Sequence, residues 1–395
     1  MPLISEIEHL AAEMTAWRRD IHAHPELGFQ EQRTAGLVSS QLKEFGIEVH
    51  EGVGRTGVVG VLKNGSSRKS IGLRADMDAL PIVEANTFAH KSTKQGVMHA
   101  CGHDGHTAML LGAAKYLAAT KSFDGTVHFI FQPAEEGVGG AKAMIDDGLF
   151  ERFPCEAVFG MHNRPGMPLG RFAVRAGPMM AGGAFFDIAI EGVGSHGARP
   201  ESGVDPVLVA AHLTAALQSI VSRNVRPVET AVLSVTQIHS GDAYNVIPQR
   251  ARLSGTARCF SKEVMVLIER NLRRLAESVA AGFGAKATTD FRVTFPPLLN
   301  DPDEAEFAAS ICNDIVGTDH VKRDPALIMA SEDFAFMLAE VPGCYINIGN
   351  GDGSSGDRAG ACEVHNPSYD FNDRALPYGA SFFARLVEQR LRSGV

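Results

Sequence analysis

The segment Met98–His106 is dense in residues that can bind metal. It contains three histidines, one cysteine and one aspartate within nine positions, with two glycines that let the backbone turn. Cys101 and His103 are two positions apart, so in an extended loop both side chains can face one centre. Thiolate and imidazole groups suit zinc and similar cations. A helix start rich in polar caps would explain a single histidine, but the cluster favours metal binding.

A pair of adjacent carboxylates, Glu135 and Glu136, follows an apolar stretch and Pro133. One carboxylate can bind a metal while its neighbour reaches the water that the metal polarises. Adjacent glutamates are often only solvated surface residues. These two, however, come just beyond the C-terminal end of an expected buried strand, where open α/β sheets build their sites.

Two further histidines occupy comparable positions. His162 follows an expected strand at 157–160, and His365 lies near the C-terminus. Either one alone would more often be a structural histidine. A structural zinc site has four ligands and no open position, whereas five ligands beside one more carboxylate suit a hydrolytic centre with two metals. With Glu135 as that carboxylate, the candidate ligands are Cys101, His103, Glu136, His162 and His365.

The elements that must position these residues alternate in type. In the first part of the chain, strands are expected at 70–73, 126–131 and 157–160, with helices at 113–119 and 141–147. This alternation is typical of βαβ units and a mostly parallel sheet.

The pattern changes near Gly182. Strands at 184–191, 230–239, 250–260 and 287–295 enclose helices at 206–222 and 263–281, which is the βαββαβ order of a ferredoxin-like unit. After Pro296-Pro297 the α/β pattern returns. The sequence therefore predicts an α/β fold with two domains. Residues 1–182 and 297–395 form a catalytic metal-binding domain with a mostly parallel sheet, and residues 183–296 form an inserted ferredoxin-like α+β domain.

Composition limits the classes of protein to consider. The chain has 395 residues, of which 45% are hydrophobic and 21% charged, as in ordinary soluble proteins. The formal net charge of −9 argues against a nucleic-acid binder, which normally carries a basic face. No apolar run approaches the roughly 20 residues of a membrane span, and residues 1–20 read as an amphipathic helix, not as a secretory signal. With six scattered cysteines, a cytoplasmic enzyme without nucleic-acid or membrane partners is expected.

A set of short motifs runs along nearly the whole chain: Trp17–Leu27, Leu73–Pro81, Cys101–His106, Gln132–Glu136, Gly194–His196, Asn245–Pro248, Ser331–Phe334 and His365–Pro367. In this order they resemble the aminoacylase and carboxypeptidase G-type metallopeptidases. The resemblance is to the amidohydrolase branch, which contains hippurate hydrolases, N-acyl-amino-acid hydrolases and plant auxin-conjugate hydrolases.

The resemblance implies a metallopeptidase catalytic domain with an inserted lid that usually dimerises, and hence a homodimer or higher homo-oligomer. It assigns Cys101 to both metals or to one of the pair, and Glu135 to the role of general base. The pattern Asp76-Met77-Asp78 matches the amidohydrolase branch. Asp78 is therefore expected to orient a metal ligand, whereas the role of Asp76 stays open.

Three residues of the inserted domain are candidates for contact with the substrate. His196 corresponds to the family's lid histidine and could donate to the oxyanion of a tetrahedral intermediate, in its own subunit or across a dimer. Asn245 and Arg258 could bind a substrate carboxylate, because a planar guanidinium pairs two oxygens at once. An ordinary strand salt bridge explains Arg258 equally well.

We therefore predict a metal-dependent amidohydrolase that cleaves small N-acyl amino acids, such as hippurate or N-acetyl amino acids. Its cofactors would be two divalent cations, Mn²⁺, Zn²⁺, Co²⁺ or Ni²⁺, because metal-bound water can reach a pKa of about 7. Glu135 would take the proton of that water and deliver it to the departing amine. The alternatives are a dipeptidase or carboxypeptidase of the same family, a catalytically silent binding protein on this fold, and Cys101 as a covalent nucleophile.

Overall fold

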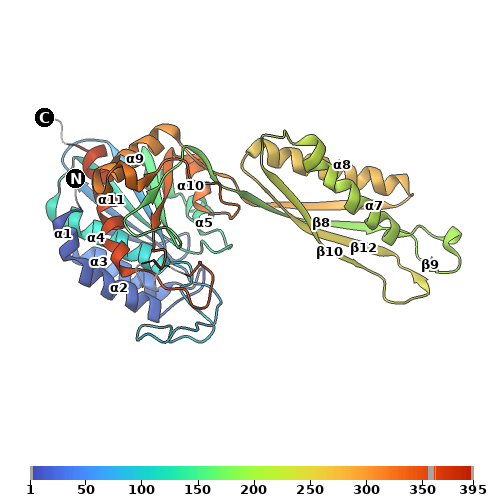
Figure 1. Ribbon diagram of the computed structural model, residues 1–395, viewed down its shortest axis with the longest axis horizontal. Coiled ribbons are helices and arrows are strands. Elements are labelled where there is room, and N and C mark those ends of the chain that lie inside the picture. Colours follow the sequence, from blue (N-terminus) through green and yellow to red (C-terminus); the bar gives the residue numbers. More distant parts are fainter. Residues whose placement is uncertain (1–2, 355–359, 361, 393–395) are drawn as a thin grey trace. The chain divides into compact units, whose positions relative to one another are not determined.

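The computed structural model describes residues 3–354, 360 and 362–392. The chain forms two compact units (Figure 1). The first comprises Met1–Gly177, Leu299–Ala326 and Phe336–Val395, and the second comprises Pro178–Leu298 and Leu327–Ala335. The second unit thus contains one long insertion and a short segment from much later in the chain.

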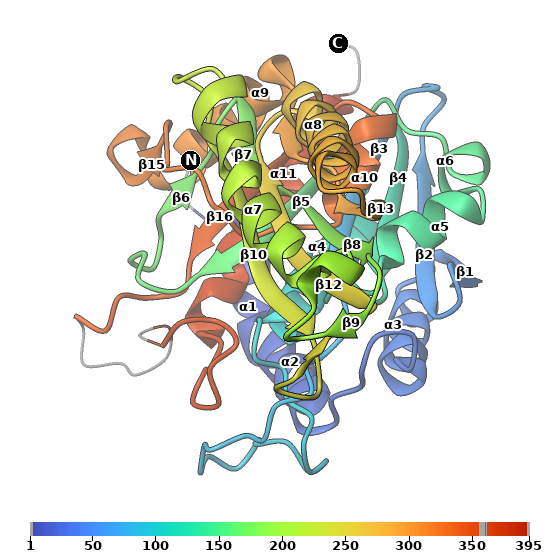
Figure 2. The ribbon, with the colours of Figure 1, turned by 90° about the vertical axis from the view of Figure 1, so that its right-hand side faces the viewer.

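The first unit is built on an eight-stranded sheet of order β1-β2-β4-β3-β5-β16-β6-β15 (Figure 2). Its central neighbours β4, β3, β5 and β16 run parallel, which confirms the predicted mostly parallel sheet. Both faces of such strands are covered, so they read as continuous apolar runs. The strands are β1 (Glu48–Val53), β2 (Gly57–Asn64), β3 (Ser70–Asp76), β4 (Gly125–Gln132), β5 (Ala157–Arg164), β6 (Phe172–Ala173), β15 (Val321–Lys322) and β16 (Gly343–Gly349).

Helices pack on this sheet and on one another, with α4 against α2, α3 and α11, and α9 against α11 and β16. The single helix expected over residues 1–20 is instead two helices separated at Leu10. The helices are α1 (Ser5–His9), α2 (Ala11–Ala23), α3 (Gln32–Glu44), α4 (His103–Thr120), α5 (Gly140–Asp146), α6 (Leu149–Arg152), α9 (Pro302–Val316), α10 (Phe334–Glu340) and α11 (Leu376–Arg390).

Helix α4 is the central helix of the first unit. It begins at His103, well before the helix predicted at 113–119, because its first turn buries polar residues that hydrophobic periodicity does not count. His103, Asp104 and His106 are all buried there. The helix therefore carries part of the predicted ligand cluster into the core. Its first turn contacts Asp76 at the end of β3 and Asn163 near the end of β5.

The second unit is an antiparallel sheet of order β10-β12-β8-β13, covered by two helices that lie side by side on one face (Figure 1). The element order is βαββαβ, and the strand order is that of a ferredoxin-like unit. Alternate residues of β8 face the helices, so Ala184, Phe186, Ile188 and Ile190 are buried. The elements are β8 (Gly182–Glu191), α7 (Pro206–Ser219), β10 (Ala231–Ser240), β12 (Arg250–Cys259), α8 (Lys262–Gly282) and β13 (Lys286–Phe295).

The remaining elements are short. Helix α7 ends at Ser219, before the predicted residue 222, and a π-helical turn follows it at Ile220–Asn224. Single turns of 3₁₀ helix occur at Pro200–Ser202, Thr318–His320 and Asp373–Ala375. The short strands are β7 (Gly177–Met180), β9 (Ser195–His196), β11 (Val246–Ile247) and β14 (Leu298–Asn300).

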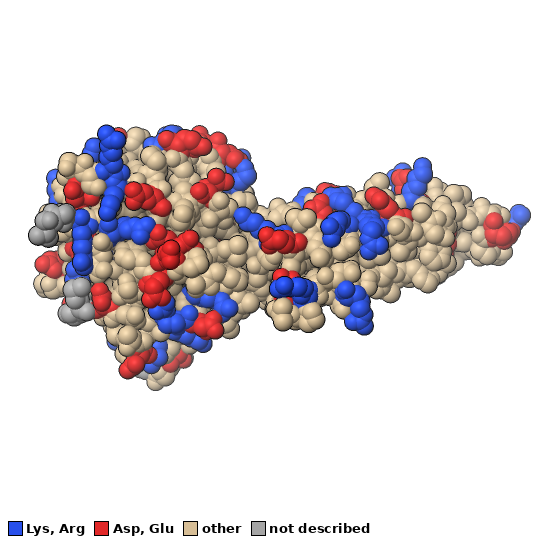
Figure 3. Space-filling view, turned by 90° about the horizontal axis from the view of Figure 1, so that it is seen from above, with Lys and Arg blue, Asp and Glu red and all other residues tan. Residues whose placement is uncertain are grey.

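The described residues contain no helix that is both long and apolar enough to cross a membrane. On the face of the molecule that Figure 3 shows, acidic and basic side chains are interspersed. Mixed charge of this kind is typical of a solvated protein surface.

We expect Gly105→Ala to destabilise the first unit, although alanine is the better helix former. A Cβ at Gly105 would lie 2.4 Å from the ring of Phe371, and overpacking of this kind costs about 1–3 kcal/mol. Gly36→Ala in α3 is the matched control, because nothing lies within 4 Å of its Cβ position. It should stabilise the protein by up to about 1 kcal/mol. Urea denaturation measures both effects, and equal shifts in the two variants would contradict the packing of α4.

Candidate metal centre

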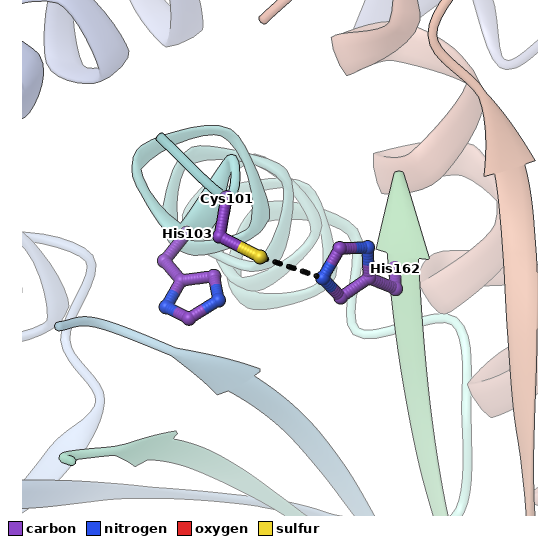
Figure 4. Close-up of side chains that lie close together, drawn as sticks. All are labelled: Cys101, His103 and His162. Carbon is purple, nitrogen blue, oxygen red and sulfur yellow. Dashed lines mark hydrogen bonds between the residues drawn. The ribbon is translucent and has the colours of Figure 1, made fainter. Parts of the chain in front are cut away.

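Cys101 and His103 lie on either side of Gly102, a position where the backbone and the available space admit only glycine. Gly102 has φ +95°, and a Cβ there would lie 2.2 Å from Nδ2 of Asn163. Since α4 begins at His103, Cys101 ends a loop and His103 opens a helix. Both side chains lie near His162, which comes from β5 (Figure 4).

The thiol of Cys101 contacts one nitrogen of His162. Sγ lies 3.3 Å from Nε2, while Nδ1 of His162 donates to the carbonyl oxygen of Asn163 at 2.6 Å. That bond leaves the lone pair on Nε2, toward the sulfur. Nδ2 of Asn163 donates to the carbonyl oxygen of Cys101 at 2.6 Å, and its Oδ1 accepts from Tyr369 at 2.7 Å. The ligand atoms of Cys101, His103 and His162 all lie within 4.8 Å of one another.

A second group contains Cys101, Glu136 and His365, whose ligand atoms also lie within 4.8 Å of one another. Nε2 of His365 is 3.3 Å from Oε1 of Glu136. His365 has φ +63°, which is uncommon for a residue other than glycine. Its N–H donates to the carbonyl oxygen of Ala100 at 2.7 Å, a bond that ties the C-terminal segment to the cysteine loop. The structure thus brings the other four predicted ligands around the sulfur of Cys101.

Asp78 lies against two of the predicted ligands. Its Oδ1 accepts from Nδ1 of His103 at 3.2 Å, and its Oδ2 accepts from the backbone N–H of Glu136 at 3.0 Å. A carboxylate on Nδ1 fixes the tautomer and leaves the lone pair of Nε2 for a metal. This contact fits the expected role of Asp78 in orienting a ligand.

Asp76 and His106 form a second buried pair beside the ligands. Nδ1 of His106 donates to Asp76 Oδ1 at 2.6 Å, and Arg74 donates to Asp76 Oδ2 at 2.7 Å. Nε2 of His106 accepts from the backbone N–H of Asn163 at 3.0 Å. No sequence pattern marked Arg74, His106 or Asn163 as a site residue, although Arg74 and His106 lie within the short motifs Leu73–Pro81 and Cys101–His106. Their contacts make Asp76 part of the framework that holds His162.

The electrostatics of the group suit a cation. Burial raises the pKa of the Cys101 thiol, and the charges of Glu136 and Glu135 raise it further. Burial alone would lower the pKa of His103, but Asp76, Asp78 and Glu136 outweigh it and raise the pKa to about 10. The carboxylates therefore favour positive charge at this place. A divalent cation would supply that charge and stabilise the thiolate.

Two further observations support this fit. Burial lowers the pKa of His162 well below its usual range, with a further contribution from His106, so its imidazole stays neutral and able to bind a metal. Nε2 of His103 is buried and makes no hydrogen bond within the described part of the chain. Buried polar atoms normally have partners, and a metal ion would provide one.

Glu135 is buried next to the ligands, at 8% exposure. Its carboxylate forms a further group with His103 and Glu136, again within 4.8 Å. Adjacent residues of the turn after β4 thus direct two carboxylates to the same place. This arrangement would let one carboxylate bind a cation while the other exchanges a proton with what binds there.

The other three predicted residues belong to the second unit. His196 lies in β9, and β9 pairs with β11, the strand that begins directly after Asn245. The N–H of Gly197 donates to the carbonyl oxygen of Asn245 at 2.7 Å. His196 and Asn245 are therefore neighbours, and both are exposed. Nδ1 of His196 accepts from the N–H of Ala198 at 3.0 Å.

Arg258 lies in β12 and makes no salt bridge with any described residue. Its guanidinium donates to Thr256 Oγ1 and to the carbonyl oxygen of Ala257 at 2.5 and 2.9 Å. A Cβ at Gly183 would lie 3.1 Å from Nη1 of Arg258 and 3.0 Å from Oγ of Ser331, and that Oγ is buried without a hydrogen-bond partner among the described residues. The described residues therefore give no support to the alternative of an ordinary salt bridge for Arg258. Ser331 lies in the short motif Ser331–Phe334, but no sequence pattern linked it to Arg258.

We expect Cys101→Ala to weaken the binding of both cations, because its sulfur belongs to both ligand groups. His162→Ala and His365→Ala should each weaken one binding event and spare the other. Isothermal titration with Zn²⁺ or Mn²⁺ measures the number and affinity of the bound ions. If Cys101→Ala still binds one cation with the affinity of the unsubstituted protein, the sulfur is not shared between the two cations.

The chain is similar to known hydrolases along nearly its whole length. The chain is 44% identical to the hippurate hydrolase of Campylobacter jejuni over 392 residues, which cover 99% of this chain and 100% of that protein. It is 37% identical to an N-acetylcysteine deacetylase of Bacillus subtilis, over 94% of both chains.

A solved structure and a family model also match the chain. The structure of the YXEP protein of Bacillus subtilis, described as a dinuclear metal-binding peptidase of the M20 family, matches with a TM-score of 0.85 and 34% identity. The match covers 97% of this chain and 99% of that one. Residues 72–389 match the model of peptidase family M20/M25/M40. The resemblance seen in the sequence is thereby confirmed, and the chain belongs to peptidase family M20/M25/M40.

Proposed function

We propose that this protein is a metal-dependent amidohydrolase that cleaves the amide bond of N-acyl amino acids, such as hippurate or N-acetyl amino acids. The observation that carries the proposal is the pair of ligand groups that share Cys101, with Glu135 beside them. The names of the relatives from Campylobacter jejuni and Bacillus subtilis support the substrate class.

The proposed ligands of two divalent cations are Cys101, His103, Glu136, His162 and His365. When bound there, the cations would polarise a water molecule and the amide carbonyl. The carboxylate of Glu135 takes a proton from the attacking water and delivers it to the amide nitrogen as the C–N bond breaks. The products are a carboxylic acid and the amino acid.

The second unit supplies the proposed contacts with the substrate. Arg258 suits the carboxylate of the amino acid, because its guanidinium has no acidic partner among the described residues and can pair two oxygens. The hydroxyl of Ser331 is close enough to join it. Asn245 is a further candidate for the carboxylate, and His196 is the proposed donor to the oxyanion.

We also propose an oligomeric state and a cellular location for the protein. The family resemblance supports a homodimer or higher homo-oligomer formed through the second unit, which exposes Ile238, Tyr244 and Val246. A cytoplasmic location and the lack of nucleic-acid or membrane partners stay predictions, consistent with the net charge of −9. Light scattering of the purified protein measures the assembly.

A substrate panel with and without chelator tests the function. We expect hydrolysis of hippurate or N-acetyl amino acids that a chelator abolishes and Mn²⁺, Zn²⁺ or Co²⁺ restores. Hydrolysis of dipeptides alone would identify a dipeptidase or carboxypeptidase instead. Bound metal without any hydrolysis would identify a silent binding protein, and hydrolysis that survives complete metal removal would favour Cys101 as a nucleophile.

Glu135→Gln should keep its bound metal and lose about 10²–10⁴-fold in kcat, since the amide cannot accept the proton. Metal analysis of the purified variant accompanies the steady-state assay, so that metal loss is separated from loss of proton transfer. A variant with near-normal kcat and full metal content would show that Glu135 is not the base.

A further inference from the structure

The turn that carries Glu135 and Glu136 contains a strained residue. Ala134 is fully buried and has φ +50°, a conformation that residues other than glycine adopt only where their surroundings impose it. The N–H of Gly140 donates to the carbonyl oxygen of Ala134 at 2.9 Å, and that of Gly137 donates to the carbonyl oxygen of Glu135 at 2.6 Å. Both bonds join residues of the turn itself. The N–H of Ala134, in contrast, donates to a residue outside the turn.

That partner is Glu31, a fully buried carboxylate that directly precedes α3. Its Oε1 accepts from the N–H of Ala134 at 2.8 Å and from the N–H of Phe29 at 3.0 Å. Its Oε2 accepts from the hydroxyl of Thr56 at 2.6 Å. A buried carboxylate is costly unless it is well bonded, and here neutral donors occupy both oxygens. Glu31 belongs to none of the candidate metal groups.

The same segment also packs directly on the turn. A Cβ at Gly28 would lie 3.1 Å from Cβ of Ala134 and 3.3 Å from Cγ2 of Val138. This close approach of Gly28 and the hydrogen bond that Glu31 accepts are separate observations, and both place the N-terminal segment against Ala134.

The two residues next to Glu135 are thus held by two buried carboxylates. The N–H of Ala134 donates to Glu31, and the N–H of Glu136 donates to Asp78 at 3.0 Å. Asp78 also bonds His103, so its position is tied to the metal ligands. Among the described residues, the carboxylate of Glu31 accepts hydrogen bonds only from the turn and from the N-terminal part of the chain, and from no candidate metal ligand.

We propose that Glu31 is a positioning residue for Glu135. It fixes the strained backbone of Ala134 and so aims the Glu135 carboxylate at the reacting water without touching substrate or metal. This inference rests on the proposed function for its effect on turnover. Its structural part, the restraint of the turn by Glu31, does not.

The test compares substitutions at two glutamates of the same segment. Glu31→Leu removes the acceptor, whereas Glu31→Gln keeps it, because an amide oxygen can accept both N–H groups and the NH₂ can donate to Thr56. Glu26→Leu is the matched control. The carboxylate of Glu26 also accepts three hydrogen bonds, from the N–H groups of Arg33 and Thr34 and the hydroxyl of Thr34, but none from the turn.

We expect Glu31→Leu to lower kcat for hippurate about a hundredfold, the effect of a misplacement of roughly 1 Å, with KM and metal content unchanged. Glu31→Gln should restore kcat to within about threefold of the unsubstituted protein, and Glu26→Leu should stay within the same range. A normal kcat in Glu31→Leu, or equal losses in Glu31→Leu and Glu26→Leu, would overturn the proposal.

Hydrogen exchange of the peptide that covers residues 133–137 provides a readout without turnover. Exchange should be faster in Glu31→Leu and unchanged in Glu26→Leu, and equal rates would overturn the restraint of the turn. If the unsubstituted protein hydrolyses none of the substrates, the proposed function fails, and this exchange result still decides the structural part.

Gly28→Ala covers the case in which Glu31→Leu does not fold. The added methyl group presses on Ala134 while all hydrogen bonds of Glu31 are kept. It should lower kcat several-fold at constant KM, and a kcat equal to that of the unsubstituted protein would overturn the proposal.

Discussion

A thiol buried among carboxylates is the constraint on which the site depends. The Cys101 sulfur belongs to both candidate ligand groups, and burial together with Glu136 and Glu135 raises its pKa. The carboxylates of Asp76, Asp78 and Glu136 raise the pKa of His103 against the effect of burial. The group therefore favours positive charge near the sulfur. Divalent cations held by these residues would supply that charge and would favour the thiolate form of Cys101. Hydrolytic chemistry follows from the same cations.

The fold meets this constraint by joining distant segments with backbone and side-chain hydrogen bonds. Asn163 binds the cysteine loop to the end of β5, and the N–H of His365 binds the C-terminal segment to the same loop. Asp78 joins His103 to the turn after β4. Asn163 and Asp78 are buried, and they lie at or just beyond the C-terminal ends of parallel strands, the usual place for sites in open α/β sheets. The rigid sheet thus sets the distances between the ligands.

Much of this arrangement could be predicted because local patterns mark it. The Cys101–His106 cluster could be recognised by its high density of metal-binding residues. Glu135 and His162 could be recognised because each follows an apolar strand. The partners of these residues carry no such mark. The contacts of Asn163 with Cys101 and Tyr369 join segments far apart in the chain, and the bond from Ala134 to Glu31 joins positions 103 residues apart. The early start of α4 was missed because its buried first turn is polar. Which side chains surround Arg258 in the described part of the chain depends on the folded sheet, and local sequence does not reveal it.

The most direct test of the account is a crystal structure of the protein loaded with Mn²⁺ or Zn²⁺, with the ions located by anomalous scattering. The account predicts two separate peaks that both contact Sγ of Cys101, one beside His103 and His162 and the other beside Glu136 and His365. A single peak, or a pair of peaks that leaves Cys101 without contact to either ion, would contradict it.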